Sequence, residues 1–496
     1  MSAQGLYDVA IVGFGPVGAV AAGLLGQAGF SVFVCDRMRG VYELPRALSL
    51  DHEIMRIFQQ LGVAEAVSAH CEPFTPSEYF GVDGQLIKRM TMLEPPYPQG
   101  YTPSLVFTQP AVEQILRARI AELPNVRVLE RAECTEIAPR ADCVTLTVNN
   151  QSVSARWLIG CDGASSQVRA RMGIGLEDLG FDEPWLVVDV FCNERGLAKL
   201  PETSVQYCEP ARPCSFLIGP SNHRRWEIAL NPGEDPKQVE RVADTWSLLA
   251  RWITPEDGTL WRRASYRFHA LVAERWRVGR CFIAGDAAHM QPPFLGQGMC
   301  QGIRDVANLS WKLADVLRGT ASAALLDSYE LERKRHVIEL TSRIKAVGAL
   351  ICERDLHKAR QRDAQLLDAC GGVVRDTPRQ DILPPLRAGA ITATRGAGQL
   401  FPQPRLRAAQ GSVLMDECHG HGFRLVTDGA LTAPTWPSVA VIDLSREPED
   451  DGVARQWLAR HEAHAALLRP DHYTFGTAAT ASELSALGRS LEAVRG

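Results

Sequence analysis

The chain has 496 residues, of which 46% are hydrophobic and 22% charged, and its formal net charge is −5. This length is sufficient for two or three domains, and the absence of a basic run excludes nucleic acid as an expected partner. No apolar run approaches about 18 residues, so we expect no membrane partner or membrane span. Residues 1–12 lack the basic region and cleavage site of a signal peptide, and the thirteen cysteines include no Cys-x-x-Cys pair. Both features predict a cytoplasmic protein with reduced thiols.

The first element has the pattern of a dinucleotide-binding unit. An apolar run over residues 7–12 predicts a strand, small residues over 19–26 predict a helix, and residues 30–35 predict a second strand. Three glycines with the spacing G-x-G-x-x-G separate the first strand from the helix, and an acidic residue ends the second strand. This order predicts a βαβ unit that binds a dinucleotide.

Each residue of this fingerprint has a physical role. Gly13 permits the tight turn, Gly15 lets the backbone approach a pyrophosphate, and Gly18 allows the helix to pack closely on the strand. Asp36 is placed to accept hydrogen bonds from an adenosine ribose.

Two further strand-to-helix turns follow. Residues 157–169 predict a strand, the turn Asp162-Gly163 and a helix start. Residues 281–284 predict a strand that ends at Gly285-Asp286, and a Pro- and Gly-rich loop then leads into a helix over 299–317. Asp286 can accept hydrogen bonds from a ribityl chain. The unpaired amides of Met299 and Cys300 favour negative charge at the edge of a flavin ring.

The three motifs, in this order, resemble those of the class A FAD-dependent aromatic monooxygenases, the single-component para-hydroxybenzoate hydroxylase-like group. Segments 43–47, 51–53, 206–213, 223–227 and 266–270 resemble the subgroup of 3-(3-hydroxyphenyl)propionate hydroxylases. Asp36 departs from the glutamate that is more common in the family. The resemblance covers residues 5–345 strongly and the remainder weakly.

The resemblance implies a reaction and its cofactors. FAD is expected as the bound cofactor, and NADH or NADPH as the reductant. Molecular oxygen and a small phenolic substrate are the expected partners, with hydroxylation through a flavin C4a-hydroperoxide and a 3-hydroxyphenylpropionate-like phenolic acid as substrate. A homo-oligomer is an open possibility. A hydroxylase that tailors a larger aromatic polyketide and a non-catalytic FAD-binding sensor are the alternatives.

The resemblance also implies site residues. Gln109, before a helix over 110–123, is expected at the ribityl chain, Arg46 near the FAD ribose and phosphates, and Pro292 and Pro293 against the flavin. The residues expected to bind FAD are Gly13, Gly15, Pro16, Val17, Gly18, Asp36, Arg37, Arg46, Gln109, Asp162, Gly163, Gly285, Asp286, Pro293, Gly296, Gly298, Met299 and Cys300.

Tyr266 and His269 are the candidate catalytic residues, because either could help to deprotonate a phenol. Tyrosine and histidine residues at such positions more often have a structural or surface role than a catalytic one. Arg224-Arg225 could bind a substrate carboxylate, but a solvated turn is favoured. His289 is expected to be structural, pairing with Asp286 or capping a turn. No metal site is expected.

The expected fold class is α/β, with a Rossmann-like FAD-binding domain, an inserted β-sheet substrate domain and a thioredoxin-like C-terminal domain. The last of these lacks a cysteine pair, so redox activity is not expected there. The expected domains are residues 1–74, 103–178 and 273–345 for FAD, 75–102 and 179–272 for substrate, 346–410 as a helical segment and linker, and 411–496 for the C-terminal domain.

Overall fold

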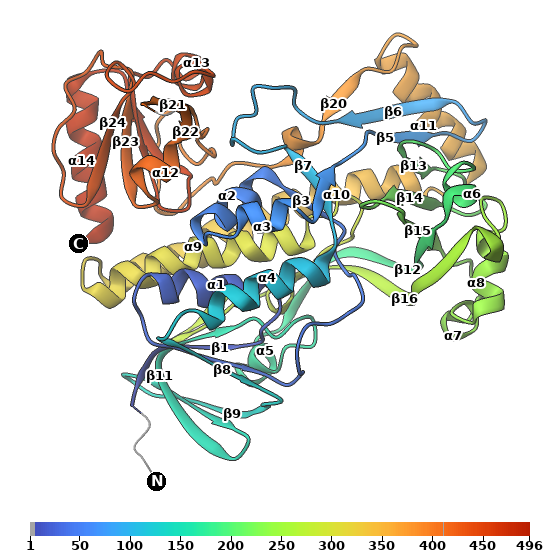
Figure 1. Ribbon diagram of the computed structural model, residues 1–496, viewed down its shortest axis with the longest axis horizontal. Helices are drawn as coiled ribbons and strands as arrows, with labels where there is room; N and C mark the ends of the chain where they lie inside the picture. The colour runs from blue at the N-terminus through green and yellow to red at the C-terminus, as the bar shows by residue number, and fades with distance from the viewer. Residues whose placement is uncertain (1–4, 410) are drawn as a thin grey trace.

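The computed structural model describes residues 5–409 and 411–496. Residues 1–4 of the expected FAD domain and residue 410 of the expected linker lie outside the described residues. Two long helices, α9 (Gly298–Arg318) and α10 (Asp327–Cys352), run through the middle of the molecule (Figure 1). One sheet lies below them, a second lies at one end, and the C-terminal unit lies at the other end.

The sheet below α9 carries the expected nucleotide-binding motifs. Its strands follow the order β17-β18-β11-β1-β2-β8, and a β9–β10 hairpin extends from β11. The strands are β1 (Tyr7–Val12), β2 (Val32–Asp36), β8 (Val126–Glu130), β9 (Cys134–Pro139), β10 (Val144–Val148), β11 (Gln151–Gly160), β17 (Arg277–Val278) and β18 (Cys281–Ile283).

Register brings the three motifs together in this sheet. β1 pairs in parallel with β11, with Val12 opposite Gly160, and β11 pairs in parallel with β18, with Gly160 opposite Ile283. Parallel strands therefore end at one edge, where ligands of open α/β sheets bind. Both faces of these strands are covered, which explains why they are continuous apolar runs.

Helices and a small sheet surround this edge. The helix α1 (Pro16–Gln27) packs against α9 at a point where no side chain fits: a Cβ on Gly302 would lie 2.5 Å from a methyl carbon of Val17. The other elements are α2 (His52–Gln60), α3 (Ala64–Ser68), α4 (Gln109–Ala121), α5 (Gln167–Arg171), and the strands β3 (Ser49–Asp51), β7 (Ser104–Phe107) and β4 (Cys71–Pro73).

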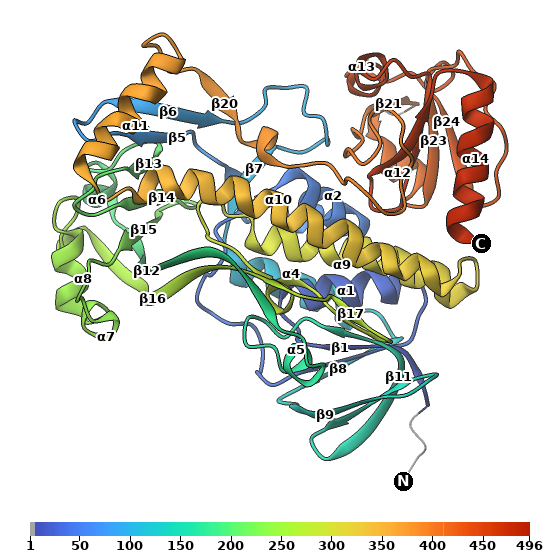
Figure 2. The same cartoon turned by 180° about the vertical axis from the view of Figure 1, so that it is seen from behind.

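The second sheet has the strand order β19-β16-β12-β15-β14-β13-β5-β6-β20. Its longest strands, β12 (Leu176–Cys192) and β16 (Gly258–Ala273), reach from this sheet toward the nucleotide-binding sheet (Figure 2). The others are β5 (Ser77–Phe80), β6 (Leu86–Thr91), β13 (Ser204–Tyr207), β14 (Cys214–Ile218), β15 (His223–Ala229), β19 (His289–Met290) and β20 (Asp376–Pro378); the short helices α6 (Glu194–Leu197), α7 (Pro236–Val239) and α8 (Val242–Leu249) lie near it.

The strand β20 corrects part of the linker expectation. It lies within residues 346–410, yet it pairs in parallel with β6, with Thr377 opposite Met90. The preceding segment includes α11 (Leu356–Ala369). A three-residue strand in a Pro- and Arg-rich stretch has no periodicity to reveal it, but it provides partners for the backbone groups of β6.

The C-terminal unit contains the sheet β24-β23-β25-β26. β23 pairs in parallel with β24 and antiparallel with β25, and β25 pairs antiparallel with β26. The elements are β21 (Arg405–Ala408), β22 (Gly411–Leu414), β23 (Phe423–Thr427), β24 (Val439–Asp443), β25 (Ala465–Leu468), β26 (Thr474–Ala478), α12 (Met415–His419), α13 (Val453–Arg460) and α14 (Ala481–Arg495).

This unit is packed onto the rest of the protein. The rings of Trp311 on α9 and Phe423 on β23 meet edge to face, with centroids 5.5 Å apart. Arg56 on α2 lies 2.6 Å from the carboxylate of Asp416 on α12, and both side chains are fully buried. Cys418 is an exposed free thiol. Across the two described ranges, no helix combines the length and apolar character needed to cross a membrane.

Candidate flavin and substrate site

The glycine-rich turn after β1 is shaped by close backbone contacts. Gly13 has φ +101°, and a Cβ there would lie 2.3 Å from the carbonyl oxygen of Cys161. A Cβ on Gly18 would lie 2.0 Å from the carbonyl oxygen of Gly13. Gly15 differs, because nothing lies within 4 Å of the position its Cβ would take. The turn is therefore closed on the protein side and open at Gly15, as backbone approach to a pyrophosphate requires.

Gly15 opens into a cavity of about 400 Å³ between the nucleotide-binding sheet and the second sheet. Many of the expected FAD residues share this cavity, although they come from distant parts of the chain. Those that line it are Gly15, Pro16, Val17, Arg46, Gln109, Gly163, Asp286, Pro293, Gly296, Gly298 and Met299.

The remaining expected FAD residues lie outside this lining. Asp36 accepts hydrogen bonds from the amides of Phe14 (2.6 Å) and Met38 (2.7 Å). The carboxylate of Asp162 accepts from Ser166 and from the first amides of α5, so it caps that helix. Gly13, Gly18 and Gly285 act through backbone packing or turn geometry, Cys300 is buried, and Arg37 is exposed. Direct FAD contacts from these residues remain predictions.

Gln109 shapes the cavity wall through the backbone. Its side-chain oxygen accepts hydrogen bonds from the amides of Arg46 (3.0 Å) and Ala47 (2.5 Å), and its nitrogen donates to Glu113. The segment that carries Arg46 is therefore held at the cavity edge. The Arg46 guanidinium itself lies 5.0 Å from the centroid of the Tyr42 ring.

Asp286 projects from the turn after β18. Its side chain is exposed and lines the cavity, and desolvation within the site raises its pKa. A carboxylate in this setting is stabilised by hydrogen bonds from donors on a ligand, such as ribityl hydroxyl groups.

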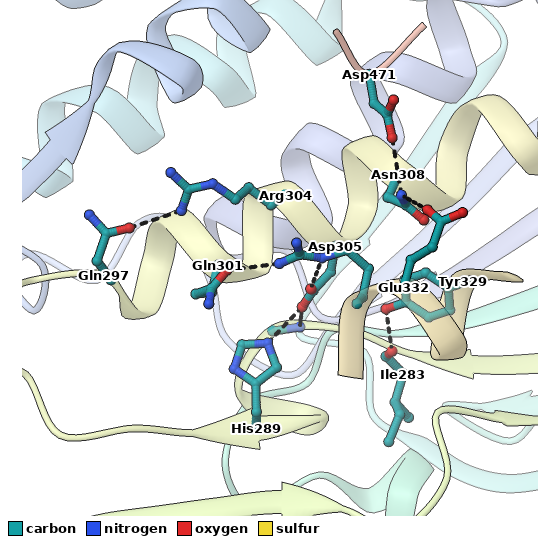
Figure 3. Close-up of polar contacts among 12 residues, drawn as sticks. Ile283, His289, Gln297, Gln301, Arg304, Asp305, Asn308, Tyr329, Glu332 and Asp471 are labelled. Atoms are coloured by element: carbon teal, nitrogen blue, oxygen red, sulfur yellow. Dashed lines mark hydrogen bonds and ion pairs between the residues drawn. The ribbon is translucent and has the colours of Figure 1, made fainter. Parts of the chain in front are cut away.

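The turn after β18 is anchored from α9, where the carboxylate of Asp305 faces the ring of His289 (Figure 3). Asp305 accepts hydrogen bonds from the amide of Gly285 (3.0 Å) and from Arg333 (2.9 Å), and its carboxylate lies 2.7 Å from Nε2 of His289. His289 was expected to pair with Asp286 or cap a turn; its partner is Asp305. The sequence did not indicate this pairing, because Asp305 lies 16 residues after His289 and approaches it only when α9 packs against the turn.

These observations fit FAD. The open space at Gly15, the cavity-facing carboxylate of Asp286 and the start of α9 at Gly298 lie along one cavity, at the edge where the three parallel strands end. Helix amides and dipole favour an electron-rich ring edge at Met299.

The second sheet forms the opposite wall. The lining residues on this wall come from six of its strands and are Ser77, Val187, Gln206, Leu217, Arg225, Glu227, Arg262, Tyr266 and Phe268 among the described residues. The rings of Phe268 and Trp185 stack with centroids 5.7 Å apart, and Phe294 lies edge-on to Trp185 at 5.6 Å. An aromatic substrate would meet a partly aromatic wall.

Tyr266 and His269 separate in the structure. Tyr266 lines the cavity, and Arg262 donates a hydrogen bond to its hydroxyl. His269 is three residues further along β16, and its Nδ1 lies 3.3 Å from Asp182 outside the cavity lining. Residues an odd number apart on a strand face opposite sides. The expectation that His269 acts on a phenol is therefore not supported by the geometry.

The sequence favoured a solvated position for Arg225, but the structure shows that this side chain is buried. It is 3% exposed, donates to Asp189 at 2.7 Å and to the carbonyl oxygens of Pro45 and Arg46. Its guanidinium therefore fixes the backbone of Pro45 and Arg46 at the edge of the flavin cavity. Arg224 lies on the other face of β15 and donates to Ser221.

Sequence reasoning missed several cavity residues, above all Glu227, Arg262 and Arg379. Only β15 has a sequence pattern that could have indicated a site: the polar residues Arg225 and Glu227 alternate with the apolar residues Trp226 and Ile228. Arg379 had none, because it lies in the stretch interpreted as a linker.

A candidate metal-ligand group lies outside the cavity lining, in the described residues of the C-terminal unit. Ligand atoms of Asp416, His421 and His472 lie within 4.8 Å of one another. Arg56 and Arg424 both donate to Asp416, which places two positive charges beside the group. Their repulsion disfavours a cation there.

Comparison with known proteins identifies the family. A family model described as an FAD binding domain matches residues 6–343. A probable NADH-specific resorcinol 4-hydroxylase of Rhodococcus jostii (strain RHA1) is 36% identical over 98% of this chain and 94% of its own length. This chain belongs to the class A FAD-dependent aromatic monooxygenases.

Other relatives of this monooxygenase agree. A 3-(3-hydroxy-phenyl)propionate/3-hydroxycinnamic acid hydroxylase of Mycobacterium sp. (strain JLS) is 32% identical over 95% of this chain and 89% of its own. The crystal structure of the flavin-dependent monooxygenase PieE with FAD and substrate has a TM-score of 0.80 at 22% identity, covering 99% of both chains. The monooxygenase fold and FAD cofactor expected from sequence are thereby confirmed.

Proposed function

We propose that this monooxygenase hydroxylates a one-ring phenolic acid similar to 3-(3-hydroxyphenyl)propionate, using NADH or NADPH and oxygen. Bound FAD supplies the redox chemistry that moves an oxygen atom from O₂ to the ring. The protein's own residues bind the ring, exclude water and control the phenolic proton. The shared cavity, with FAD residues on one wall and the second sheet on the other, is the observation that supports this function.

Cavity size supports a small substrate. About 400 Å³ lies at the low end of typical ligand sites. The flavin ring and the substrate must share this cavity, and a one-ring acid asks less space of it than a polyketide of several fused rings. A solved aklavinone-11 hydroxylase with FAD and aklavinone shares the fold at 22% identity and a TM-score of 0.79, which carries no substrate information to this chain.

Arg379 supports an acidic substrate. It lines the cavity, is 9% exposed, and has no carboxylate within 4.0 Å among the residues that the structure describes. Its guanidinium donates to the carbonyl oxygen of Leu295 (3.0 Å) and lies 3.9 Å from the centroid of the Phe74 ring. Burial lowers its pKa, and a substrate carboxylate would offset that cost by charge-assisted hydrogen bonds.

The test is a comparison of substrates and variants. Purified holoprotein should consume NADH or NADPH and form a dihydroxylated product with 3-(3-hydroxyphenyl)propionate. Arg379→Met should raise KM for the acid about 10- to 150-fold, as expected for a hydrogen bond to a charged group, and should leave KM for resorcinol within about twofold. A wild-type preference for resorcinol would contradict the acid assignment. A protein that forms no product with any phenol would contradict the function.

We also propose that the C-terminal unit is thioredoxin-like and that the protein can self-associate. The strand order β24-β23-β25-β26, its single parallel edge pair and the terminal α14 support the first proposal. Size-exclusion chromatography with light scattering tests the second; a monomer at all concentrations would contradict it.

A further inference from the structure

Glu227 is a buried carboxyl group that the site has not yet used. It is 5% exposed and lines the cavity, and its carboxylate has no hydrogen-bond partner among the residues that the structure describes. Its carboxylate opens to the cavity rather than being enclosed by protein, so a ligand in the cavity can supply a hydrogen-bond partner.

Strand register places Glu227 at a boundary. The cavity side of β15 carries Arg225, Glu227 and Ala229 in succession, and their opposite residues on β12 are Asp189, Val187 and Trp185. Arg225 and Asp189 form a buried ion pair, whereas Ala229 and Trp185 belong to the apolar cluster that includes Phe294. Glu227 therefore lies where a charged region meets an aromatic one, as a phenol with its ring in the apolar part would require.

The neighbouring charges suit a proton acceptor. Arg225 on the same strand and Arg262 on β16 are positive, Asp189 on β12 is negative, and Tyr266 on β16 is the other titratable group on this wall. Burial raises the pKa of Glu227 to about 7, with Asp189 acting in the same direction and both arginines opposing it. A base is most effective when its pKa lies near the working pH.

We propose, on the basis of the proposed function, that Glu227 is the catalytic residue that accepts the proton of the substrate's phenolic hydroxyl. The O–H bond breaks, the proton forms a new O–H bond with a carboxylate oxygen of Glu227, and the electron pair stays on the phenolic oxygen. The resulting phenolate is more electron-rich at its ring carbons. The protonated Glu227 returns its proton to solvent before the next turnover, so no oxidant or reductant enters this step.

The main test is Glu227→Gln, which keeps size and removes basicity. Its hydroxylation rate at pH 7 should fall about 10²-fold or more, the usual contribution of a general base. The wild-type rate should rise with pH through about 7. In the variant that limb should be absent, and activity should recover only as the substrate ionises near pH ~10. Glu227→Asp, which keeps the carboxyl group, should recover part of the activity.

Equilibrium binding gives a readout that is independent of turnover. Resorcinol binding, measured from the absorbance change of bound FAD, should tighten in the wild type as pH rises from 6 to 8, because an ionised Glu227 accepts the phenol hydrogen bond. It should not depend on pH over this range in Glu227→Gln.

Glu183→Gln is the matched control. Glu183 lies on β12, its pKa is also raised by burial, and it is outside the cavity lining. This variant should behave as the wild type does. Equal pH dependence of binding in the wild type and Glu227→Gln, or an unchanged rate, would overturn the assignment. If the wild type hydroxylates no phenol, the proposed function fails, and the binding profile still decides whether Glu227 contacts the hydroxyl.

Discussion

His289 and Asp305 form a buried pair, with Nε2 of His289 2.7 Å from the carboxylate of Asp305. The same carboxylate accepts the amide of Gly285, so one acid on α9 fixes the backbone of the turn that presents Asp286 to the flavin cavity. Although burial raises the pKa of Asp305, His289 and Arg333 hold it below its ordinary value.

Asp305→Asn should destabilise the protein and weaken FAD binding together, because it leaves Arg333 buried beside a neutral group. Breaking a buried ion pair costs about 3–5 kcal/mol. Urea denaturation and FAD content after dialysis measure the two effects. Asp327→Asn is the control, because Asp327 on α10 is 75% exposed and its pair with Arg277 contributes about 0–1 kcal/mol. Normal FAD content and stability in Asp305→Asn would contradict the anchoring role.

Asp286→Ala should lower FAD affinity without unfolding the protein. It removes an acceptor whose hydrogen bonds contribute about 1.5–3 kcal/mol, which corresponds to a loss of about 10- to 150-fold. Equilibrium titration of apoprotein with FAD measures the change. Asp286→Asn keeps an acceptor oxygen and should lose less. Equal affinity in wild type and Asp286→Ala would show that this carboxylate does not contact the cofactor.

Gly15→Val should abolish FAD binding while leaving the apoprotein folded. Gly15 has φ −73°, which any residue adopts, and its Cβ would enter open cavity space rather than protein atoms. Gly18→Val makes the contrast, since its Cβ would meet the carbonyl of Gly13 at 2.0 Å and should disrupt folding. Circular dichroism and FAD content separate the outcomes. Stoichiometric FAD in Gly15→Val would be incompatible with a pyrophosphate at this turn.

Arg56→Met should weaken the attachment of the C-terminal unit, at a cost of about 3–5 kcal/mol. Burial raises the pKa of Asp416, but Arg424 and Arg56 hold it well below its ordinary value, and His421 and His472 also face it. A carboxyl with a depressed folded pKa stabilises the protein above its unfolded pKa of about 3.9, and this is lost only as pH falls toward the folded value. Burial lowers the pKa of His421 to about 4, so it stays neutral at pH 5.

The cost of Arg56→Met should therefore be the same at pH 5 and pH 8 when measured by urea denaturation. Arg446→Met, which removes an exposed guanidinium from the same unit, is the control and should cost little. A cost that disappears by pH 5 would show that Asp416 is protonated there and that the pair is weaker than its geometry indicates.

The nucleotide-binding half was predictable because local chemistry determines it. Gly13 and Gly18 have backbone contacts that no other residue tolerates, and β1, which ends just before Gly13, is a buried apolar strand. The substrate wall was less predictable, since Glu227 and Arg262 meet only through pairing of strands distant in sequence. Arg379 reaches the cavity through β20, whose three residues have no pattern. His269 was misplaced because β16 turns it away from Tyr266.

The central claim is that a phenol bound in this cavity receives one oxygen atom from O₂. The direct measurement is turnover of 3-(3-hydroxyphenyl)propionate with NADH under ¹⁸O₂, followed by mass spectrometry of the product and a count of NADH consumed. We predict a dihydroxylated product that carries one ¹⁸O atom for each NADH oxidised, and no label when only the water is enriched. NADH oxidation that yields hydrogen peroxide without labelled product, for this acid and for resorcinol, would contradict the account.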